Sequence, residues 1–326
     1  RPHLKDKVLN KDINNVSAKE LLKTAGLKRG EAALVSGGPP CQPFSTVRRR
    51  ESISSDEGRL FIKFLEIVWD IYPKYFIFEN VKGILSAAIQ HKPLNMRDLD
   101  GKNLVDKEVL GSGWDFINRQ FLKKLRTGKK GGYNLKVWEL NAADFGVPQK
   151  RRRVFIVGTR NGINLQMPQG KFKLKSKTVR DAIGNLNGKH ERPKVDYYPY
   201  DQIRFEIFRK KLVKSGQNWT VLPEDLQKKV MGKGWYATGG KVGFCRRLSW
   251  DLPSPTITTS PVGRATNLCH PEKPRPLNYV ECALIQGFPK SWKFSGSLSQ
   301  KYRQIGNAVP PNLGYAIGME IQKQKK

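Results

Sequence analysis

Short apolar runs alternate with amphipathic segments over the first part of the chain. Residues 32–35 and 75–78 are nearly continuous apolar runs that stop at turn-forming or polar residues, a pattern typical of buried strands. Between them, apolar residues recur at helical spacing from Leu60 to Val68, and Pro73 ends that segment. A strand, a helix and a strand in this order predict two parallel strands in one sheet that is buried on both faces.

Two more strands are predicted further along the chain, at residues 136–140 and 154–157. From about residue 159 to 260 the periodicity weakens, and Gly, Pro, Tyr and Lys become frequent. We interpret this region as a separate, irregular module. The segment 312–321 is predicted to be helical. The pattern as a whole predicts an α/β fold, and a length of 326 residues suggests two domains.

The charge of the chain narrows the classes of partner. The 60 Lys and Arg residues exceed the 28 Asp and Glu residues by 32, which favours a polyanion, either nucleic acid or an anionic membrane surface. No run reaches the roughly 18 apolar residues that a membrane span needs, and the aromatic residues do not gather on one face of a long basic helix. Nucleic acid is therefore the favoured partner, and no membrane is expected.

Cysteine usage argues against two common small-domain architectures. The four cysteines are scattered, with no Cys-x-x-Cys pair, which disfavours a disulfide scaffold and a zinc ribbon. No secretory h-region is visible. We therefore expect a protein that is not secreted and that binds no metal. The cysteines are Cys41, Cys245, Cys269 and Cys282.

Two candidate reactive side chains follow the two predicted parallel strands. Cys41 lies in Gly-Gly-Pro-Pro-Cys-Gln-Pro-Phe-Ser, residues 37–45, directly after the first strand, and Glu79 directly follows the second. Ligands bind at the carboxyl ends of strands in open α/β sheets. A lone cysteine is often a small buried hydrophobe, and an acid at this position often caps a helix. A thiol and a carboxyl at the same edge favour a reactive site.

Basic and glycine-containing segments supply further candidates. Residues 149–153 read Gln-Lys-Arg-Arg-Arg before a predicted strand. Alternation along a strand would place Arg151 and Arg153 on one side, where they could bind phosphates or a carbonyl oxygen. A solvated basic loop is the alternative. Near the end, a turn followed by the start of a helix is a structural explanation of Gly306 and the prolines within residues 304–311.

Taken together, the order of these motifs resembles that of the DNA (cytosine-5) methyltransferases. The resemblance covers residues 12 to 320 apart from the variable module. Its motifs are 38–45 (Gly-Pro-Pro-Cys-Gln-Pro-Phe-Ser), 78–81 (Phe-Glu-Asn-Val), 149–154 (Gln-Lys-Arg-Arg-Arg-Val), 275–277 (Arg-Pro-Leu) with Glu281 and 286–289 (Gln-Gly-Phe-Pro), and 304–311 (Gln-Ile-Gly-Asn-Ala-Val-Pro-Pro).

The resemblance implies an enzyme that methylates C5 of a cytosine flipped out of duplex DNA, and a role as the modification arm of a restriction system. Cys41 would add to C6 as a thiolate. With a reference pKa near 8.5, about 3 % of a free thiol is ionised at pH 7, so the site should favour ionisation. Glu79 would bind N3 and the exocyclic amine, which needs a raised pKa or a proton shared with N3. Arg153 would contact O2, with Arg151 supporting the pocket.

The resemblance also implies S-adenosyl-L-methionine as the cofactor, S-adenosyl-L-homocysteine as its product, and no metal. Residues that match cofactor-side positions are Asp12, Pro40, Leu60, Asn307 and Ala308. Residues that would contact the DNA backbone after the nucleophile are Ser45, Arg48, Arg49 and Arg50.

The implied fold is an α/β, Rossmann-like mixed sheet of the S-adenosylmethionine-dependent type with a smaller, irregular target-recognition domain. Residues 1–180 and 300–326 would form the catalytic domain and residues 181–299 the target-recognition domain. The family's amino-terminal strand and Gly-rich cofactor turn have no match, and Lys11 replaces a usual Gly before Asp12. We therefore expect an incomplete catalytic sheet, completed either by more of the same chain or by a second polypeptide.

Two alternatives stay open at this point. A few proteins of this family act on transfer RNA, although the roughly 100-residue recognition module is larger than theirs. A catalytically silent DNA-binding or regulatory subunit would explain the missing Gly-rich turn, although Cys41, Glu79 and Arg153 argue against it. A DNA-modifying enzyme is expected in the cytoplasm of a prokaryote, at the nucleoid, or wherever DNA is.

Overall fold

The chain divides into two units, each with its own core. The computed structural model describes residues 7–39, 56–90, 104–127, 132–160, 162–186, 202–236, 243–263 and 266–324. The first unit comprises residues 1–140 and 152–166, and the second comprises residues 141–151 and 167–326.

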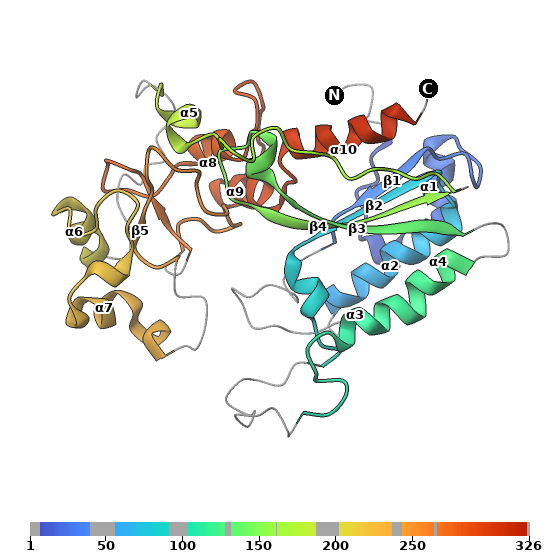
Figure 1. The fold of residues 1–326 in the computed structure, drawn as a ribbon, viewed down its shortest axis with the longest axis horizontal. Helices are drawn as coiled ribbons and strands as arrows, with labels where there is room; N and C mark the ends of the chain where they lie inside the picture. The colour runs from blue at the N-terminus through green and yellow to red at the C-terminus, as the bar shows by residue number, and fades with distance from the viewer. Residues whose placement is uncertain are drawn as a thin grey trace. The chain divides into compact units, whose positions relative to one another are not determined.

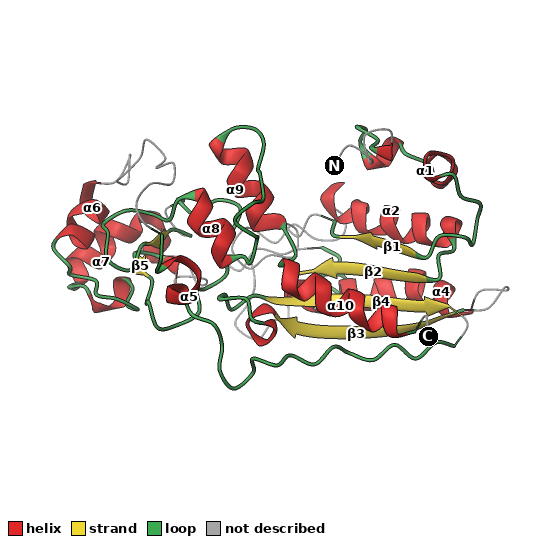
Figure 2. Ribbon diagram, turned by 90° about the horizontal axis from the view of Figure 1, so that it is seen from above, coloured by secondary structure: helices red, strands yellow, loops and turns green. Residues whose placement is uncertain are grey.

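A mixed sheet forms the centre of the first unit. Its described strands lie in the order β1-β2-β4-β3 (Figures 1 and 2). Strands β1 and β2 are parallel, and β2 and β4 are antiparallel. Helices α2 and α4 lie on one face of the sheet (Figure 1). The elements are α1 (Ala18–Ala25), β1 (Leu34–Gly37), α2 (Asp56–Ile71), β2 (Tyr75–Asn80), α3 (Ser112–Ile117), α4 (Lys123–Thr127), β3 (Tyr133–Asn141) and β4 (Arg152–Arg160).

The predicted strand, helix and parallel strand are therefore confirmed. Strand β2 is buried over nearly its whole length, because its apolar side chains point alternately to both faces. On the helix side, the rings of Phe61 and Phe78 pack edge to face with centroids 4.4 Å apart, and Phe64 packs against the same Phe78 ring. Together with Phe76 and Ile156, these residues belong to the core of the first unit.

Strand β1 departs from the expectation that both parallel strands are buried. Leu34 is 43 % exposed, and exposed and half-buried residues alternate along the strand. The physical reason is its position, because β1 lies at the edge of the described sheet and pairs only with β2 among the described strands. Helix α1 covers part of this region, where Leu21 and Leu22 pack with Ile67 of α2 and Val35 of β1.

The second unit is mostly helical and loop-like, in agreement with the weak periodicity of this part of the sequence. One core lies around α8 and α9 and another around α6 and α7. The described elements are α5 (Val179–Ile183), α6 (Gln202–Arg209), α7 (Glu224–Met231), β5 (Arg246–Arg247), β6 (Leu268–Cys269), α8 (Tyr279–Ile285), α9 (Leu298–Asn307) and α10 (Pro311–Lys323).

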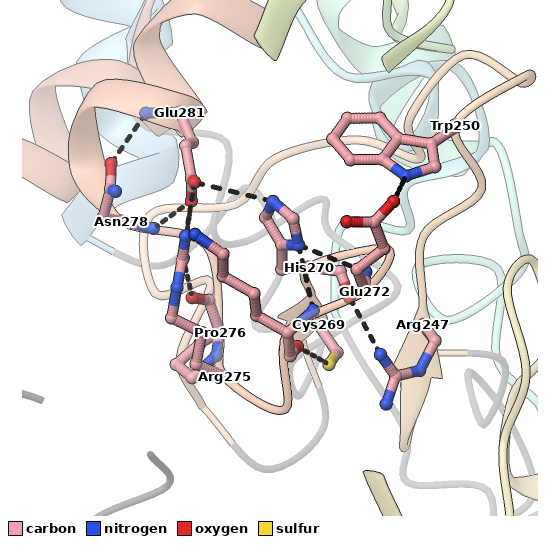
Figure 3. Close-up of polar contacts among 10 residues, drawn as sticks. Arg247, Trp250, Cys269, His270, Glu272, Arg275, Pro276, Asn278 and Glu281 are labelled. Atoms are coloured by element: carbon pink, nitrogen blue, oxygen red, sulfur yellow. Dashed lines mark hydrogen bonds and ion pairs between the residues drawn. The ribbon is translucent and has the colours of Figure 1, made fainter. Parts of the chain in front are cut away.

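A buried polar cluster organises the start of α8 (Figure 3). Glu281 and Asn278 form a reciprocal capping box, and both carboxylate oxygens of Glu281 accept hydrogen bonds from Arg275, at 2.7 and 2.8 Å. Nε2 of His270 lies 3.9 Å from the same carboxylate. Burial lowers the pKa of His270 from 6.5 to about 4, against the opposing effect of Glu281. The imidazole is therefore neutral at physiological pH.

Residues 300–326 belong to the second unit. Gly306 lies inside α9 rather than in a turn, and a Cβ there would lie 2.5 Å from the Thr258 backbone, so close packing explains the glycine. The division into a catalytic and a target-recognition domain stays a prediction. In the described part of the chain, no helix is long and apolar enough to cross a membrane.

Candidate active site

Glu79 and Arg153 meet on adjacent strands of the first unit. Glu79 lies near the end of β2, and Arg153 lies near the start of the antiparallel β4. Arg153 Nε is 2.9 Å from Glu79 Oε1, and the two side chains are only 10 % and 13 % exposed. Arg153 Nη1 also donates to the Arg152 carbonyl at 2.8 Å. The sheet thus brings together an acid and an arginine that are 74 positions apart in the sequence.

This contact bears on the charge of Glu79. An arginine within hydrogen-bond distance stabilises a carboxylate in its ionised form. The contact with Arg153 therefore favours the ionised carboxylate of Glu79 over its protonated form.

The glycines before Cys41 are needed for space. Neither Gly37 nor Gly38 has a positive φ. A Cβ on Gly37 would lie 2.5 Å from the Phe64 ring, and a Cβ on Gly38 would lie 3.1 Å from Glu79 Oε2. Close packing therefore explains both glycines. The segment that leads to Cys41 is therefore in contact with the acid.

Arg151 has a different environment from Arg153. It lies in the second unit and is buried, and its guanidinium donates to the carbonyls of Ile257 at 3.1 Å and Gly306 at 2.7 Å. Arg151 directly precedes β4, which begins at Arg152. Arg151 and Arg153 are both buried, and Arg152 between them is exposed. That Arg151 supports a pocket around a bound base stays a prediction.

The sequence analysis missed a pair of buried glutamines. Gln149 Nε2 donates to Gln286 Oε1 at 2.6 Å, and Gln286 Nε2 donates to the Ala308 carbonyl at 2.7 Å. Both glutamines are fully buried. Each opens a motif that the sequence analysis quoted, so the signal was the position of an uncharged polar residue at the start of a motif. Arg151 and Gln286 thus hold the carbonyls on either side of Asn307.

The expected cofactor residues fall in both units. Asp12 is exposed and accepts from Asn14 N at 2.8 Å at the start of a short 3-10 helix, Ile13–Asn15. Leu60 is half-buried on α2. Asn307 is exposed, and Ala308 follows it at the end of α9. In the first unit, the exposed carboxylate of Asp12 is of the kind that accepts hydrogen bonds from an amine or a hydroxyl group.

Several predicted residues lie outside the described part of the chain. Pro39 is the last described residue before the nucleophile segment. The undescribed ones are Pro40, Cys41, Ser45, Arg48, Arg49 and Arg50.

Comparison with known proteins decides the family. The model of the family described as C-5 cytosine-specific DNA methylase matches residues 3–97 and 114–323. The chain belongs to this family. It is 37 % identical over 291 residues to the Type II methyltransferase M.Sau96I of Staphylococcus aureus. It is also 37 % identical over 299 residues to the Type II methyltransferase M.Eco47II of Escherichia coli. These matches cover 89 % and 90 % of this chain but 60 % and 64 % of the two relatives.

Solved structures agree with this C-5 cytosine methylase assignment at the level of fold. Entamoeba histolytica methyltransferase EhMeth matches with a TM-score of 0.55 at 16 % identity, over 100 % of this chain and 86 % of that one. A DNMT2 variant from Spodoptera frugiperda matches with a TM-score of 0.54 at 15 % identity, over 95 % and 83 %. The predicted methyltransferase-type α/β fold is confirmed.

Proposed function

We propose that this protein transfers a methyl group from S-adenosyl-L-methionine to C5 of a cytosine flipped out of duplex DNA. The observation that carries the proposal is the buried contact between Glu79 and Arg153, beside the Gly-Gly-Pro segment that leads to Cys41. An acid, an arginine and Gly38, three positions before Cys41, lie together at the carboxyl end of β2. Membership of the C-5 cytosine-specific DNA methylase family supports the same proposed reaction.

The geometry of the pair suits the edge of cytosine. In that base, N3 and O2 are on neighbouring positions, so their partners must lie close together. Glu79 and Arg153 are 2.9 Å apart at their nearest atoms, as two groups sharing this edge require. Glu79 binds N3 and the exocyclic amine, and Arg153 binds O2. Both contacts draw electron density from the ring and make C6 open to a nucleophile.

Cys41 is the nucleophile in this proposal. Its thiolate forms a bond to C6, and the electron pair released into the ring makes C5 nucleophilic. When bound, S-adenosyl-L-methionine supplies the methyl group that C5 accepts. Loss of the C5 proton to a base then expels Cys41 and restores the ring. Because a thiol at its reference pKa of about 8.5 is mostly protonated at pH 7, the surroundings of Cys41 must favour the thiolate.

The net charge of +32 favours binding to the negatively charged backbone of DNA. Extruding a base costs a few kcal/mol, which contacts to the DNA backbone offset without reading sequence. Ser45 and Arg48, Arg49 and Arg50 follow the nucleophile and are the proposed backbone contacts. Residues 181–299 are the proposed target-recognition domain. Similarity to Type II methyltransferases supports a role as the modification arm of a restriction system.

The proposed cofactor residues are Asp12, Pro40, Leu60, Asn307 and Ala308.

The exposed edge of β1 supports a further proposal about the cofactor side of the sheet. Leu34 is exposed there. The strand, Leu-Val-Ser-Gly, contains no charged residue or proline that would prevent it from pairing with a further strand. We propose that an additional strand, from more of this chain or from a second polypeptide, pairs with β1 and carries the Gly-rich cofactor turn.

Methyl transfer tests the proposal. The protein, with whatever co-purifies from its host, is incubated with methyl-labelled S-adenosyl-L-methionine and either mixed-sequence duplex DNA or transfer RNA. We expect label in DNA C5 and its loss in Cys41→Ser. Transfer to RNA alone would overturn the DNA substrate, and undiminished transfer by Cys41→Ser would overturn the mechanism. If no methyl group is transferred even in the presence of the co-purifying chain, the result would favour a catalytically silent DNA-binding subunit.

A further inference from the structure

Asn80 joins the acid-bearing strand to the segment that leads to Cys41. It follows Glu79 on β2 and is 1 % exposed. Its Nδ2 donates to the Pro39 carbonyl at 3.3 Å, and its Oδ1 accepts from Val81 N at 2.8 Å. The amide therefore bonds to two backbone groups, one at Pro39, two positions before the proposed nucleophile, and one at Val81, the residue after Asn80. Sequence analysis assigned no role to this residue.

Pro39 is a good point at which to hold the nucleophile segment. A proline has a fixed φ, and the next residue, Pro40, is also a proline, so few torsions separate the Pro39 carbonyl from Cys41. Gly38 and Gly37 restrict the same segment from the other end, since Gly38 lies against the Glu79 carboxylate and Gly37 against the Phe64 ring. Three consecutive residues thus have defined contacts before the chain reaches Cys41.

We propose that Asn80 is a positioning residue, which sets the placement of Cys41 relative to Glu79 through its hydrogen bond to the Pro39 carbonyl. This inference rests on the proposed function. Asn80 touches neither substrate nor cofactor in this account. Its effect is geometric, because a nucleophile displaced by about 1 Å can lose about 100-fold in rate.

The test is Asn80→Asp, which keeps the shape of the side chain and an acceptor for Val81 N but removes the donor to Pro39. The matched control is Tyr133→Phe. That change also deletes one buried hydrogen bond to a proline carbonyl, from Tyr133 Oη to Pro73 at 2.7 Å, in the same unit but away from Cys41. Duplex DNA containing 5-fluorocytosine is used to trap the covalent adduct, and its rate of formation is measured beside the affinity for DNA.

For Asn80→Asp we expect adduct formation to slow by about 10- to 100-fold, with the dissociation constant for DNA changed less than about 3-fold. Tyr133→Phe should leave the adduct rate within about 3-fold of the wild type. The deficit of Asn80→Asp should shrink at acidic pH, because a protonated carboxyl can again donate to the Pro39 carbonyl. Equal rates for both variants, or a deficit that does not change with pH, would overturn the inference.

A second measurement separates this inference from the proposed function. Alkylation of Cys41 by iodoacetamide, located by mass spectrometry, and hydrogen exchange of the peptide around residues 36–41 need no DNA. We expect Asn80→Asp, but not Tyr133→Phe, to change the alkylation rate and to speed exchange in that peptide. If neither responds, Asn80 does not position the segment. If both respond but the wild type forms no adduct, the proposed function fails and the positioning role stands.

Discussion

At the scale of single residues, the ion pair between Glu79 and Arg153 is the feature with the clearest chemical consequence. The two side chains are 10 % and 13 % exposed and hold each other in place across two strands. In the proposed function, the edge of a bound cytosine replaces part of this mutual contact with contacts to N3 and O2. Binding of the base would then loosen the contact between Glu79 and Arg153, since the same atoms take part in both.

The substitution Glu79→Gln tests this role. An amide keeps a hydrogen bond to Arg153 and to the exocyclic amine but cannot supply a proton at N3, so we expect single-turnover methyl transfer to fall by about 100- to 10,000-fold. The control is Glu139→Gln, which removes an exposed carboxylate that pairs with Lys82 at 2.9 Å. That variant should retain the wild-type rate within about 2-fold, since exposed pairs contribute little. Equal losses in both variants would contradict the role of Glu79.

At the scale of elements, buried arginine and histidine side chains stabilise the second unit where regular structure is sparse. Arg247, on β5, donates to the Phe208 carbonyl at 2.6 Å and the Val213 carbonyl at 2.9 Å, and it reaches the His270 and Pro271 carbonyls at 3.3 Å. One guanidinium thus satisfies carbonyls at the end of α6, in the following loop and after β6. This arrangement substitutes for a sheet in joining separate segments.

Replacing Arg247 by lysine should therefore destabilise the module built on α6 and α7. An ammonium cannot reach four carbonyls in different directions, so we expect a loss of about 2–4 kcal/mol in the free energy of unfolding, measured with denaturant. Hydrogen exchange should speed up first in residues 202–231. The control Arg209→Lys alters an exposed pair with Glu206 and should leave the denaturation midpoint unchanged. A midpoint for Arg247→Lys that equals the wild type would refute this account of the module.

The start of α8 gives a prediction about pH. The folded-state pKa of His270 is about 4, below the ordinary 6.5, because burial penalises the imidazolium. Protonation therefore favours the unfolded chain. The contribution of the neutral, buried imidazole to the free energy of unfolding is fully present above pH 6.5. It is lost as pH falls from 6.5 to 4, and the loss reaches about 3 kcal/mol. The groups facing the ring are Glu281, Arg275, Lys273 and Glu272.

Unfolding free energies at pH 7 and pH 4.5 measure this effect. His270→Asn keeps an acceptor for the backbone N–H groups of Glu272 and Lys273 but cannot take up a proton. We expect the loss of stability on acidification to be smaller in this variant than in the wild type. The same pH dependence in both proteins would show that His270 does not titrate as described.

The sequence predicted the elements of the first unit better than their environments. Apolar runs were sufficient for β2 and β4, and helical spacing was sufficient for α2, because each buries a continuous apolar surface. Exposure of β1 could not be predicted, since a run of apolar residues does not reveal which strand lies at the edge. The partners of Arg151 could not be predicted either, because Ile257 and Gly306 are distant in sequence.

In the candidate site, too, the sequence identified some residues and not others. Glu79 and Arg153 were found through motif order, and the structure brings them together. Asn80, Gln149 and Gln286 were overlooked because uncharged amides carry no chemical signal until their partners are known. A motif thus predicts which residues matter, whereas tertiary contacts are needed to assign how each acts.

At the scale of the whole molecule, the net charge of +32 predicts how DNA binding depends on salt. Neutralising six to ten phosphates would release as many counterions, so the affinity for duplex DNA should fall by about 10³- to 10⁵-fold between 50 and 200 mM salt. Fluorescence anisotropy with a labelled duplex over a salt series measures this slope. An affinity for duplex DNA that changes less than about 10-fold over the same range of salt would contradict binding through contacts to the backbone phosphates.

The central claim is that Cys41 forms a covalent bond to cytosine beside the pair of Glu79 and Arg153. It is tested most directly by incubating the protein, with any co-purifying chain and S-adenosyl-L-methionine, with mixed-sequence duplex DNA in which 5-fluorocytosine replaces cytosine. Fluorine at C5 cannot leave as a proton does, so the adduct persists. We predict a protein–DNA adduct that peptide mass spectrometry locates at Cys41 and that Cys41→Ser abolishes. An adduct on another residue, or none while methyl transfer to ordinary DNA proceeds, would contradict it.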